Sequence, residues 1–254
     1  QNLHLMSNST GGSPTDQWIG NSYNIKPEIA DQVSVGYAKT FNGNMYELSS
    51  EAYYKTMQNQ IDFKDGTDVN NVPDIESELL YGKGRAYGLE MMLKKKRGRL
   101  TGWVGYTISK TERQINGINS GQWYNAKQDR THDLSIVAVY DLTKRWTLSG
   151  TFIYTTGNAV TFPTGKYILN GMTVYQYGNR NADRMPATHR LDISATYERP
   201  ARKKWQGSWT FGLYNVYGRQ NPFSMTFKEN KTNPQKIDAV QTSLFRWVPS
   251  ITYN

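Results

Sequence analysis

The sequence contains no cysteine and no long hydrophobic run. Without cysteine, the chain has neither the disulfides that staple small secreted domains nor a zinc site with thiolate ligands. Without about 18 consecutive apolar residues it has no candidate transmembrane helix, and no signal peptide opens it. Its first residues, QNLHLM, already resemble a strand, so we expect either a mature chain or an internal fragment.

Hydrophobic residues are also scarce. They make up 37% of the 254 residues, and the mean hydropathy of -0.71 is low for a globular enzyme of this length. Aromatic residues are nevertheless abundant, with 18 Tyr and 7 Trp, which argues against a disordered chain. This combination is typical of a sheet that is apolar on one face only and keeps its aromatic rings near an interface.

The formal net charge is +9, and basic proteins often bind nucleic acid. Here the basic residues gather in predicted turns, at residues 94–99 and 199–204, and no helix-turn-helix, zinc-finger or RNA-recognition pattern is present. We therefore expect no nucleic-acid partner. Solvated turns, or turns that contact lipid headgroups, account for the charge.

Period-two alternation dominates the sequence, and helical periodicity is almost missing. Residues 184–200 combine an apolar face with a row of charges. The apolar face carries Leu191, Ile193, Ala195 and Tyr197. The opposite face carries Arg190, Asp192, Ser194, Thr196 and Glu198. Similar stretches, including residues 2–6 and 244–254, bring the expected total to about ten strands, many of which suit a tilted crossing of a bilayer.

The predicted connections alternate in length. Short turns are expected at 41–44, 96–99, 141–145 and 199–207, and long loops at about 7–30, 61–82, 114–127, 157–187 and 219–239. This alternation is typical of an outer-membrane β-barrel. The expected inward face is too polar and bulky for a ten-stranded barrel, so we expect part of a wider one. The inward residues include Glu51, Glu90, Arg190, Asp192, Glu198 and Arg246.

Five segments together resemble the TonB-dependent outer-membrane receptors. They are RMPATHRLDISATY (184–197), GLYNVYGRQNPF (212–223), AYGLEMMLKKK (86–96), WYNAKQDRTHDLS (123–135) and RWVPSITYN (246–254). The resemblance implies an all-β fold, a transmembrane antiparallel barrel of 22 strands, of which residues 1–254 supply about the last ten. The plug domain that fills such a barrel and the first strands of the barrel are both expected outside this chain.

The resemblance also implies a function in the outer membrane of a Gram-negative bacterium. A receptor of this kind imports a scarce nutrient such as a siderophore, haem, cobalamin, a glycan or a peptide. Its expected partners are the lipid bilayer, the plug of the same protein, TonB through the plug, and a surface lipoprotein or other outer-membrane protein. Two alternatives stay open, a passive channel or adhesion barrel and a soluble basic all-β binding module.

Enzyme activity is not expected, because no strand offers a convincing Ser–His pair and the three histidines are scattered. We expect no cofactor and no metal site. Ligand contacts are expected in the long loops, where aromatic and basic side chains stack on or pair with a ligand; packing of the loops on one another is the alternative. The candidates are Trp18, Trp123, Tyr124, Tyr167, Tyr175, Tyr177 and Arg180.

Overall fold

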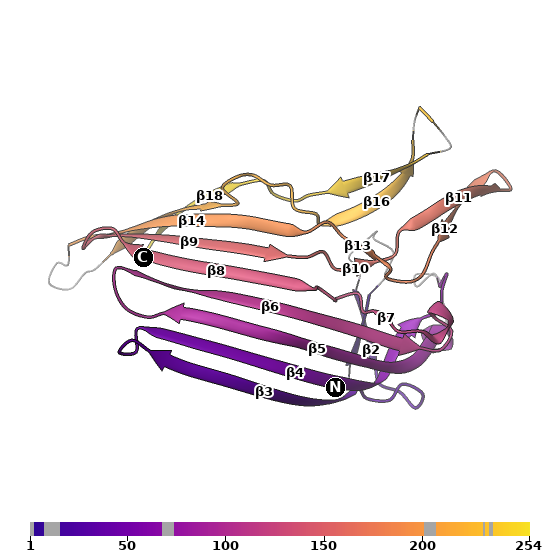
Figure 1. Cartoon of the computed structure of the whole chain (residues 1–254). Helices are drawn as coiled ribbons and strands as arrows, with labels where there is room; N and C mark the ends of the chain where they lie inside the picture. Colours follow the sequence, from indigo (N-terminus) through magenta and orange to yellow (C-terminus); the bar gives the residue numbers. More distant parts are fainter. Residues whose placement is uncertain (1–2, 8–15, 68–73, 201–206, 231, 234–235) are drawn as a thin grey trace.

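The computed structural model describes residues 3–7, 16–67, 74–200, 207–230, 232–233 and 236–254. The largest element is one antiparallel sheet, the wall sheet, in which nine strands follow one another in sequence order (Figure 1). A two-residue strand, β7 (Tyr124–Asn125), pairs with the end of β6. The nine strands are β3 (Ile29–Phe41), β4 (Tyr46–Phe63), β5 (Leu79–Lys95), β6 (Leu100–Ile115), β8 (His132–Asp141), β9 (Trp146–Thr155), β14 (Thr188–Glu198), β15 (Ser208–Tyr214) and β18 (Val248–Tyr253).

The wall strands are long, and their connections differ at the two ends. Strands β4, β5 and β6 have 18, 17 and 16 residues, about three times the usual five to six. Short turns join the strands at the left of Figure 1, which we call the turn end, and long connections join them at the right, the loop end. The predicted alternation of short turns and long loops is confirmed.

Four two-stranded sheets lie outside the wall sheet, at its loop end. The hairpin predicted around Asn170–Gly171 is present, and both residues have the positive φ values, 51° and 77°, that a type I′ turn requires. The small sheets pair β1 (Leu3–Ser7) with β2 (Asp16–Gly20), β10 (Ala159–Val160) with β13 (Asp183–Arg184), β11 (Pro163–Leu169) with β12 (Met172–Tyr177), and β16 (Ser224–Glu229) with β17 (Ile237–Thr242). The described helical segments are two single 3-10 turns, η1 (Ile75–Glu78) and η2 (Asn119–Gly121), and neither is long and apolar enough to cross a membrane.

Two predicted strands differ from the structure. Residues 2–6 were expected among the wall strands; residue 2 lies outside the described residues, and β1, which contains the rest, pairs only with β2 in a separate sheet. The last strand was expected over 244–254, but β18 begins at Val248. Phe245 and Trp247 lie before it with 65% and 59% of their surface exposed, because pairing with the seven-residue β15 gives β18 partners only from Val248 onward.

The strand register gives the wall sheet one apolar and one polar face. Residues directly opposite each other in an antiparallel pair lie on the same face, so the paired residues form rows across the strands. One such row on the apolar face is Leu48, Leu93, Val104, Ile136, Phe152 and Leu191. One row on the polar face is Glu51, Glu90, Thr107, Asp133, Thr155 and Thr188.

Aromatic rings border the apolar face at both ends. At the loop end, Tyr54 stacks on Tyr87 with ring centroids 6.2 Å apart; at the turn end, Trp146 contacts Tyr197 at 5.1 Å. Four strands place their two border rings eight residues apart: Tyr46 and Tyr54, His132 and Tyr140, Trp146 and Tyr154, His189 and Tyr197. Eight residues extend about 26 Å along a strand, and a tilt of about 40° leaves about 20 Å. The apolar band of membrane barrels, bordered by aromatic girdles, is about 25 Å tall.

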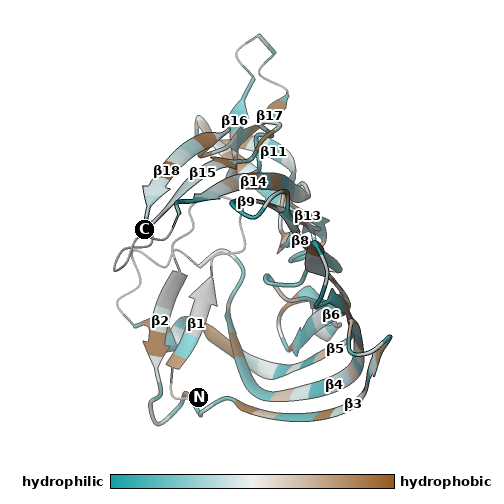
Figure 2. Ribbon diagram, turned by 90° about the vertical axis from the view of Figure 1, so that its left-hand side faces the viewer, coloured by the Kyte–Doolittle hydropathy of each residue, from teal (hydrophilic) through white to brown (hydrophobic). Residues whose placement is uncertain are grey.

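The wall sheet is curved but not closed. Figure 2 shows the strands following an arc from β3 to β18, and within the described residues these two edge strands each have only one neighbour. Eight of the buried apolar residues form two clusters near the loop end rather than a layer between two sheets. One cluster is Ile19, Ile25, Ile61, Phe63 and Leu79, and the other is Ile115, Ile118 and Tyr124.

The position of Ile193 gives a direct test of the apolar face. It lies midway between His189 and Tyr197, and 45% of its surface is exposed. In the intact barrel, Ile193→Arg should lower the free energy of unfolding by about 2–4 kcal/mol, because a charge at the bilayer midplane loses its hydration. Denaturant unfolding from lipid bilayers measures this. Ser194→Arg, one residue along on the polar face, should cost less, and equal costs would contradict the assignment of faces.

Candidate functional site

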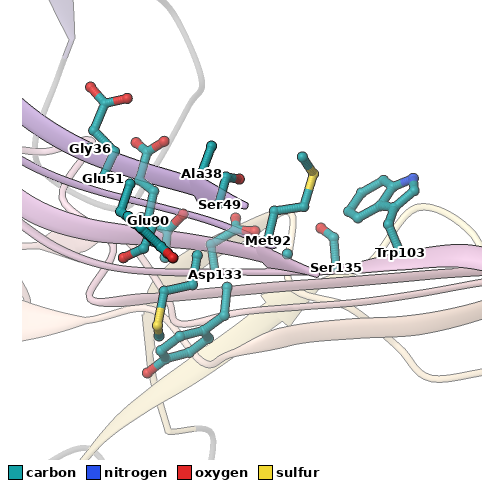
Figure 3. A pocket seen from close by; sticks show the side chains of 15 residues that line it. Gly36, Ala38, Ser49, Glu51, Glu90, Met92, Trp103, Asp133 and Ser135 are labelled. Atoms are coloured by element: carbon teal, nitrogen blue, oxygen red, sulfur yellow. The ribbon is translucent and has the colours of Figure 1, made fainter. Parts of the chain in front are cut away.

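Three carboxylates stand in one row on the polar face. The register pairs Glu51 of β4 with Glu90 of β5, and it connects Glu90 through Thr107 of β6 to Asp133 of β8. We call Glu51, Glu90 and Asp133 the carboxylate row. They line a depression of about 490 Å³, and Figure 3 shows their side chains among the polar-face residues around it.

The described part of the chain does not neutralise the carboxylate row. None of its three carboxylates forms an ion pair or hydrogen bond with another described residue. Glu51 and Glu90 lie directly opposite each other, a position in which like charges destabilise a sheet. A cationic group in front of the polar face would relieve this repulsion.

Arg190 and Asp192, further along the same face, are already paired. Arg190 Nε donates to Asp192 Oδ2 at 2.9 Å, and Nη1 donates to the Tyr214 hydroxyl at 3.0 Å. The guanidinium carbon lies 4.5 Å from the centroid of the Tyr214 ring. Asp192 Oδ1 accepts the Asn215 backbone N–H at 2.8 Å, so the pair also fixes the turn after β15, where Asn215 has a φ of 54°.

The other two predicted inward residues lie apart from these groups. Glu198 is the last residue of β14, at the turn end. Its backbone N–H donates to the backbone oxygen of Arg145 at 2.8 Å. Arg246 precedes β18, and its backbone oxygen accepts from the Asn215 side chain. The six predicted residues therefore form two adjacent pairs and two separate positions rather than one site.

Arg180 ties together three segments at the loop end. Its Nη1 lies 2.9 Å from Asp62 Oδ1 and donates to the Phe63 backbone oxygen at 2.7 Å, while Nη2 lies 2.5 Å from Asp65 Oδ1. The backbone of Arg180 exchanges two hydrogen bonds with the Asn119 side chain, at 2.8 and 3.0 Å. The end of β4 and the connections after β4, after β6 and after β9 thus meet at one residue.

Burial strengthens this arrangement. Arg180 and Tyr124 are 8% and 5% exposed, and Tyr124 donates its hydroxyl to Asp62 Oδ2 at 2.9 Å. Burial, and then the charge of Asp62, raise the pKa of Tyr124 well above its ordinary value of 10, so it stays a neutral donor. Burial by itself would lower the pKa of Arg180, but the nearby aspartates outweigh it and the net shift is upward.

A second buried carboxylate, Asp129, completes the connection between loops. It is 1% exposed, accepts the Thr111 backbone N–H at 2.5 Å, and forms an ion pair with Arg184. Nearby, the Asn181 side chain donates to the Asn125 backbone oxygen at 2.8 Å. We call the segments held by these contacts, residues 62–65, 116–131 and 156–187, the loop collar.

The two long hairpins, β11–β12 and β16–β17, also contact each other; we call them the hairpin pair. Glu229 Oε1 lies 3.3 Å from Lys166 Nζ and accepts the Thr173 hydroxyl at 2.5 Å. Tyr175 donates its hydroxyl to the Phe227 backbone oxygen at 3.4 Å. The hydrogen bonds from Thr173 and Lys166 lower the pKa of Glu229 below its ordinary value of 4.5.

Three of the seven predicted ligand residues are used inside the chain. Arg180 and Tyr124 have their polar groups engaged within the loop collar, and the Tyr175 hydroxyl is engaged within the hairpin pair. Loop packing accounts for these contacts. The structure does not test whether any of the seven residues contacts a ligand.

The other four predicted residues present surface at the loop end. Trp18 in β2 is 62% exposed, and Tyr167 and Tyr177, in β11 and β12, are 52% and 45% exposed. Trp123 lies beside β7 with its ring centroid 4.2 Å from the guanidinium carbon of Arg85. These residues come from different small elements and do not form a single constellation.

The residues that organise the loop collar were not singled out from the sequence as loop-tying residues. Asp62 and Asp129 find partners far along the chain; Arg184 pairs with Asp129 from 55 residues away. One local signal was available, because Asp62 lies between two large apolar residues, Ile61 and Phe63, at the end of a strand. A buried acid in such a position needs a partner.

Histidines and acids give no metal site among the described residues, where no group of three is placed to hold an ion. The two histidines of the wall sheet instead contact tyrosines. His132 Nδ1 lies 2.7 Å from the Tyr106 hydroxyl, and His189 Nδ1 lies 2.8 Å from the Tyr217 hydroxyl. Both belong to the loop-end girdle of the apolar face.

The sequence matches the family model described as TonB dependent receptor-like, beta-barrel, over residues 4–216. The chain belongs to this family. Its members are transporters and not enzymes, and the family in general has a plug domain and interacts with TonB. The wall sheet is therefore part of a transmembrane barrel, with its apolar face toward lipid and its polar face toward the lumen.

Two solved receptors share the fold. The ferric-catecholate import receptor Fiu of E. coli K12 has a TM-score of 0.54 and 15% identity, over 99% of this chain and 30% of that chain. The ferripyoverdine receptor of the outer membrane of Pseudomonas aeruginosa, bound to ferripyoverdine, has a TM-score of 0.54 and 12% identity, over 91% and 28%. The chain thus spans less than a third of either receptor. No curated protein matches its sequence.

Replacing Arg180 should loosen the loop collar. Arg180→Gln in the intact barrel removes the cation 2.9 Å from buried Asp62 and leaves only Arg113, at 3.9 Å. We therefore expect a cost below the about 3–5 kcal/mol of breaking a buried pair completely. We expect faster proteolysis and faster amide exchange within residues 116–131 and 156–187, with the wall strands unchanged. Arg97→Gln, in an exposed turn at the other end, is the control; equal protection of the loops in both variants would contradict the role of Arg180.

Acid should separate the hairpin pair. The pKa of Glu229 is lower when the hairpins are in contact, so its contribution is present above its ordinary pKa and is lost as the pH falls below about 4.5. Because the chain has no cysteine, spin labels at cysteines replacing Asn170 and Lys228 measure the separation directly. The distance should broaden on acidification, and Glu229→Gln should broaden it at neutral pH. If the distance between the two labels is unchanged by acid and by Glu229→Gln, Glu229 does not hold the two hairpins together.

Proposed function

We propose that the chain is the C-terminal part, residues 1–254, of the barrel of an outer-membrane receptor in a Gram-negative bacterium, and that this receptor imports a scarce nutrient with energy delivered through TonB. The observation that carries the proposal is the carboxylate row. A lumen wall whose opposed acids have no partner among the described residues is suited to a barrel filled by a cationic surface.

The surface that fills the barrel is proposed to be the plug domain of the same protein. Cationic side chains of the plug would meet Glu51 and Glu90, where they offset the repulsion across β4 and β5. Arg190 and Asp192 already neutralise each other, so we expect them to offer the plug hydrogen bonds rather than net charge. Glu198 and Arg246 would meet it only near the two ends of the wall.

Ligand capture is proposed for the exposed aromatic residues at the loop end. Trp18, Tyr167 and Tyr177 present the largest free rings among the predicted ligand residues, and such rings stack on flat or cyclic ligands. Tyr124, Tyr175 and Arg180 would position these loops from within. A surface lipoprotein or another outer-membrane protein that contacts the loops stays a prediction.

The cargo class is proposed from the solved relatives. Both are receptors for iron chelates by name, which makes ferric siderophores the first class to test; haem, cobalamin, glycans and peptides follow. At 12–15% identity the likeness shows the fold alone, so the choice among these cargoes depends on experiment.

Energised uptake of the cargo is the decisive measurement. Cells that express the full-length receptor should accumulate radiolabelled ferric siderophore in a strain with TonB, and lose accumulation, while keeping surface binding, when TonB is deleted. Equal uptake without TonB would favour a passive channel. Binding without uptake in either strain would favour an adhesion barrel, and recovery of the receptor in the aqueous fraction without detergent would establish a soluble binding module.

A further inference from the structure

Three cations lie just above the loop-end girdle on the apolar face. Arg85 and Lys83 lie two and four residues before Tyr87 on the same face of β5. Lys110 of β6 lies directly opposite Tyr87. We call Lys83, Arg85 and Lys110 the cation cluster. The stacked rings of Tyr54 and Tyr87 mark the border of the lipid-facing band, so the cluster lies at the height of the lipid headgroups.

One buried carboxylate organises this cluster. Glu112 is directly opposite Arg85 and only 5% exposed. Its Oε2 lies 2.8 Å from both Nε and Nη2 of Arg85, and its Oε1 lies 2.8 Å from Lys110 Nζ. The two cations are therefore held side by side by a shared anion, which reduces the entropy lost when they bind a ligand together.

The cluster keeps a surplus of positive charge and free donors. Three cations face one carboxylate, and Lys83 has no acidic partner among the described residues; its Nζ lies 5.8 Å from the Trp123 ring centroid. Arg85 uses only one edge of its guanidinium on Glu112, and its side chain and that of Lys110 are 32% and 45% exposed. The remaining N–H groups have no acceptor among the described residues and are available to an anion.

Trp123 completes the arrangement from the loop side. Its ring centroid lies 4.2 Å from the Arg85 guanidinium carbon, because the two-residue strand β7 pairs with β6 at Glu112 and Arg113 and brings the preceding residue over the cluster. An amphipathic ring at this height is suited to the boundary between acyl chains and headgroups. Cations and an aromatic ring thus meet where a lipid would place its phosphate.

We infer that the cation cluster binds the phosphate of a phosphorylated lipid in the membrane leaflet at the loop end. The ligand is a lipid rather than free phosphate, because the donors lie on the face that meets acyl chains and open toward the membrane plane. This site is separate from the import pathway, since the lumen lies on the other face of the sheet. Its occupancy would fix the height and rotation of the barrel among its lipids.

The test uses the intact receptor in detergent micelles and bisphosphorylated lipid A as the probe, with binding followed by native mass spectrometry. Lys83→Gln together with Lys110→Gln should weaken binding about 30-fold, as expected for the loss of two charges beside an anionic lipid. Lys39→Gln with Lys95→Gln removes two lysines of the same face near the turn end and should leave binding unchanged. Lys83→Arg with Lys110→Arg should retain it.

Three further arms distinguish the source of the phosphate and secure the result. Fully dephosphorylated lipid A should bind as weakly to the wild type as the probe binds to the glutamine variant. Inorganic phosphate at millimolar concentration should not displace the probe. Equal binding of the dephosphorylated lipid, displacement by phosphate, or equal losses in the control variant would each overturn the inference. Because no cargo or TonB is present, the outcome is independent of the proposed import function.

Discussion

Backbone pairing within the wall sheet is the constraint on which the other features depend. In lipid, every backbone N–H and C=O group needs a hydrogen-bond partner inside the sheet. Each inner strand of the wall sheet is hydrogen-bonded to a neighbouring strand on both sides. The pairing also fixes the register, and a slip of one residue would exchange the two faces. The apolar band, the girdles and the position of the carboxylate row all follow from that register.

The same chain treats charge differently at different heights. In the loop collar, buried Asp62 and Asp129 each have an arginine partner, because a buried carboxylate needs one. On the polar face, Glu51 and Glu90 oppose each other, and neither has an arginine partner in the described part of the chain. A wall that tolerates this repulsion keeps its acids available for another surface, whereas the collar uses its acids for itself.

Local patterns predicted the wall well and the collar poorly. The alternation of apolar and polar residues over 190–198 predicts both faces of β14, because successive side chains of a strand point to opposite faces of the sheet. Arg180, in contrast, contacts Asp65, which lies 115 residues away in the sequence. Periodicity predicts local structure and cannot predict a contact over that separation. Trp123 was expected to meet a ligand, and it lies against Arg85 because a two-residue strand, too short to leave a pattern, directs it there.

The eight-residue interval between border rings limits how such a chain can change length. Inserting one residue in a wall strand would turn every following side chain to the wrong face. Inserting two would preserve the faces but carry a ring about 7 Å out of its layer. Neither penalty applies beyond the girdles. Insertions and deletions should therefore be tolerated in the loops and not in the wall strands, which leaves the loops free to differ while the span stays constant.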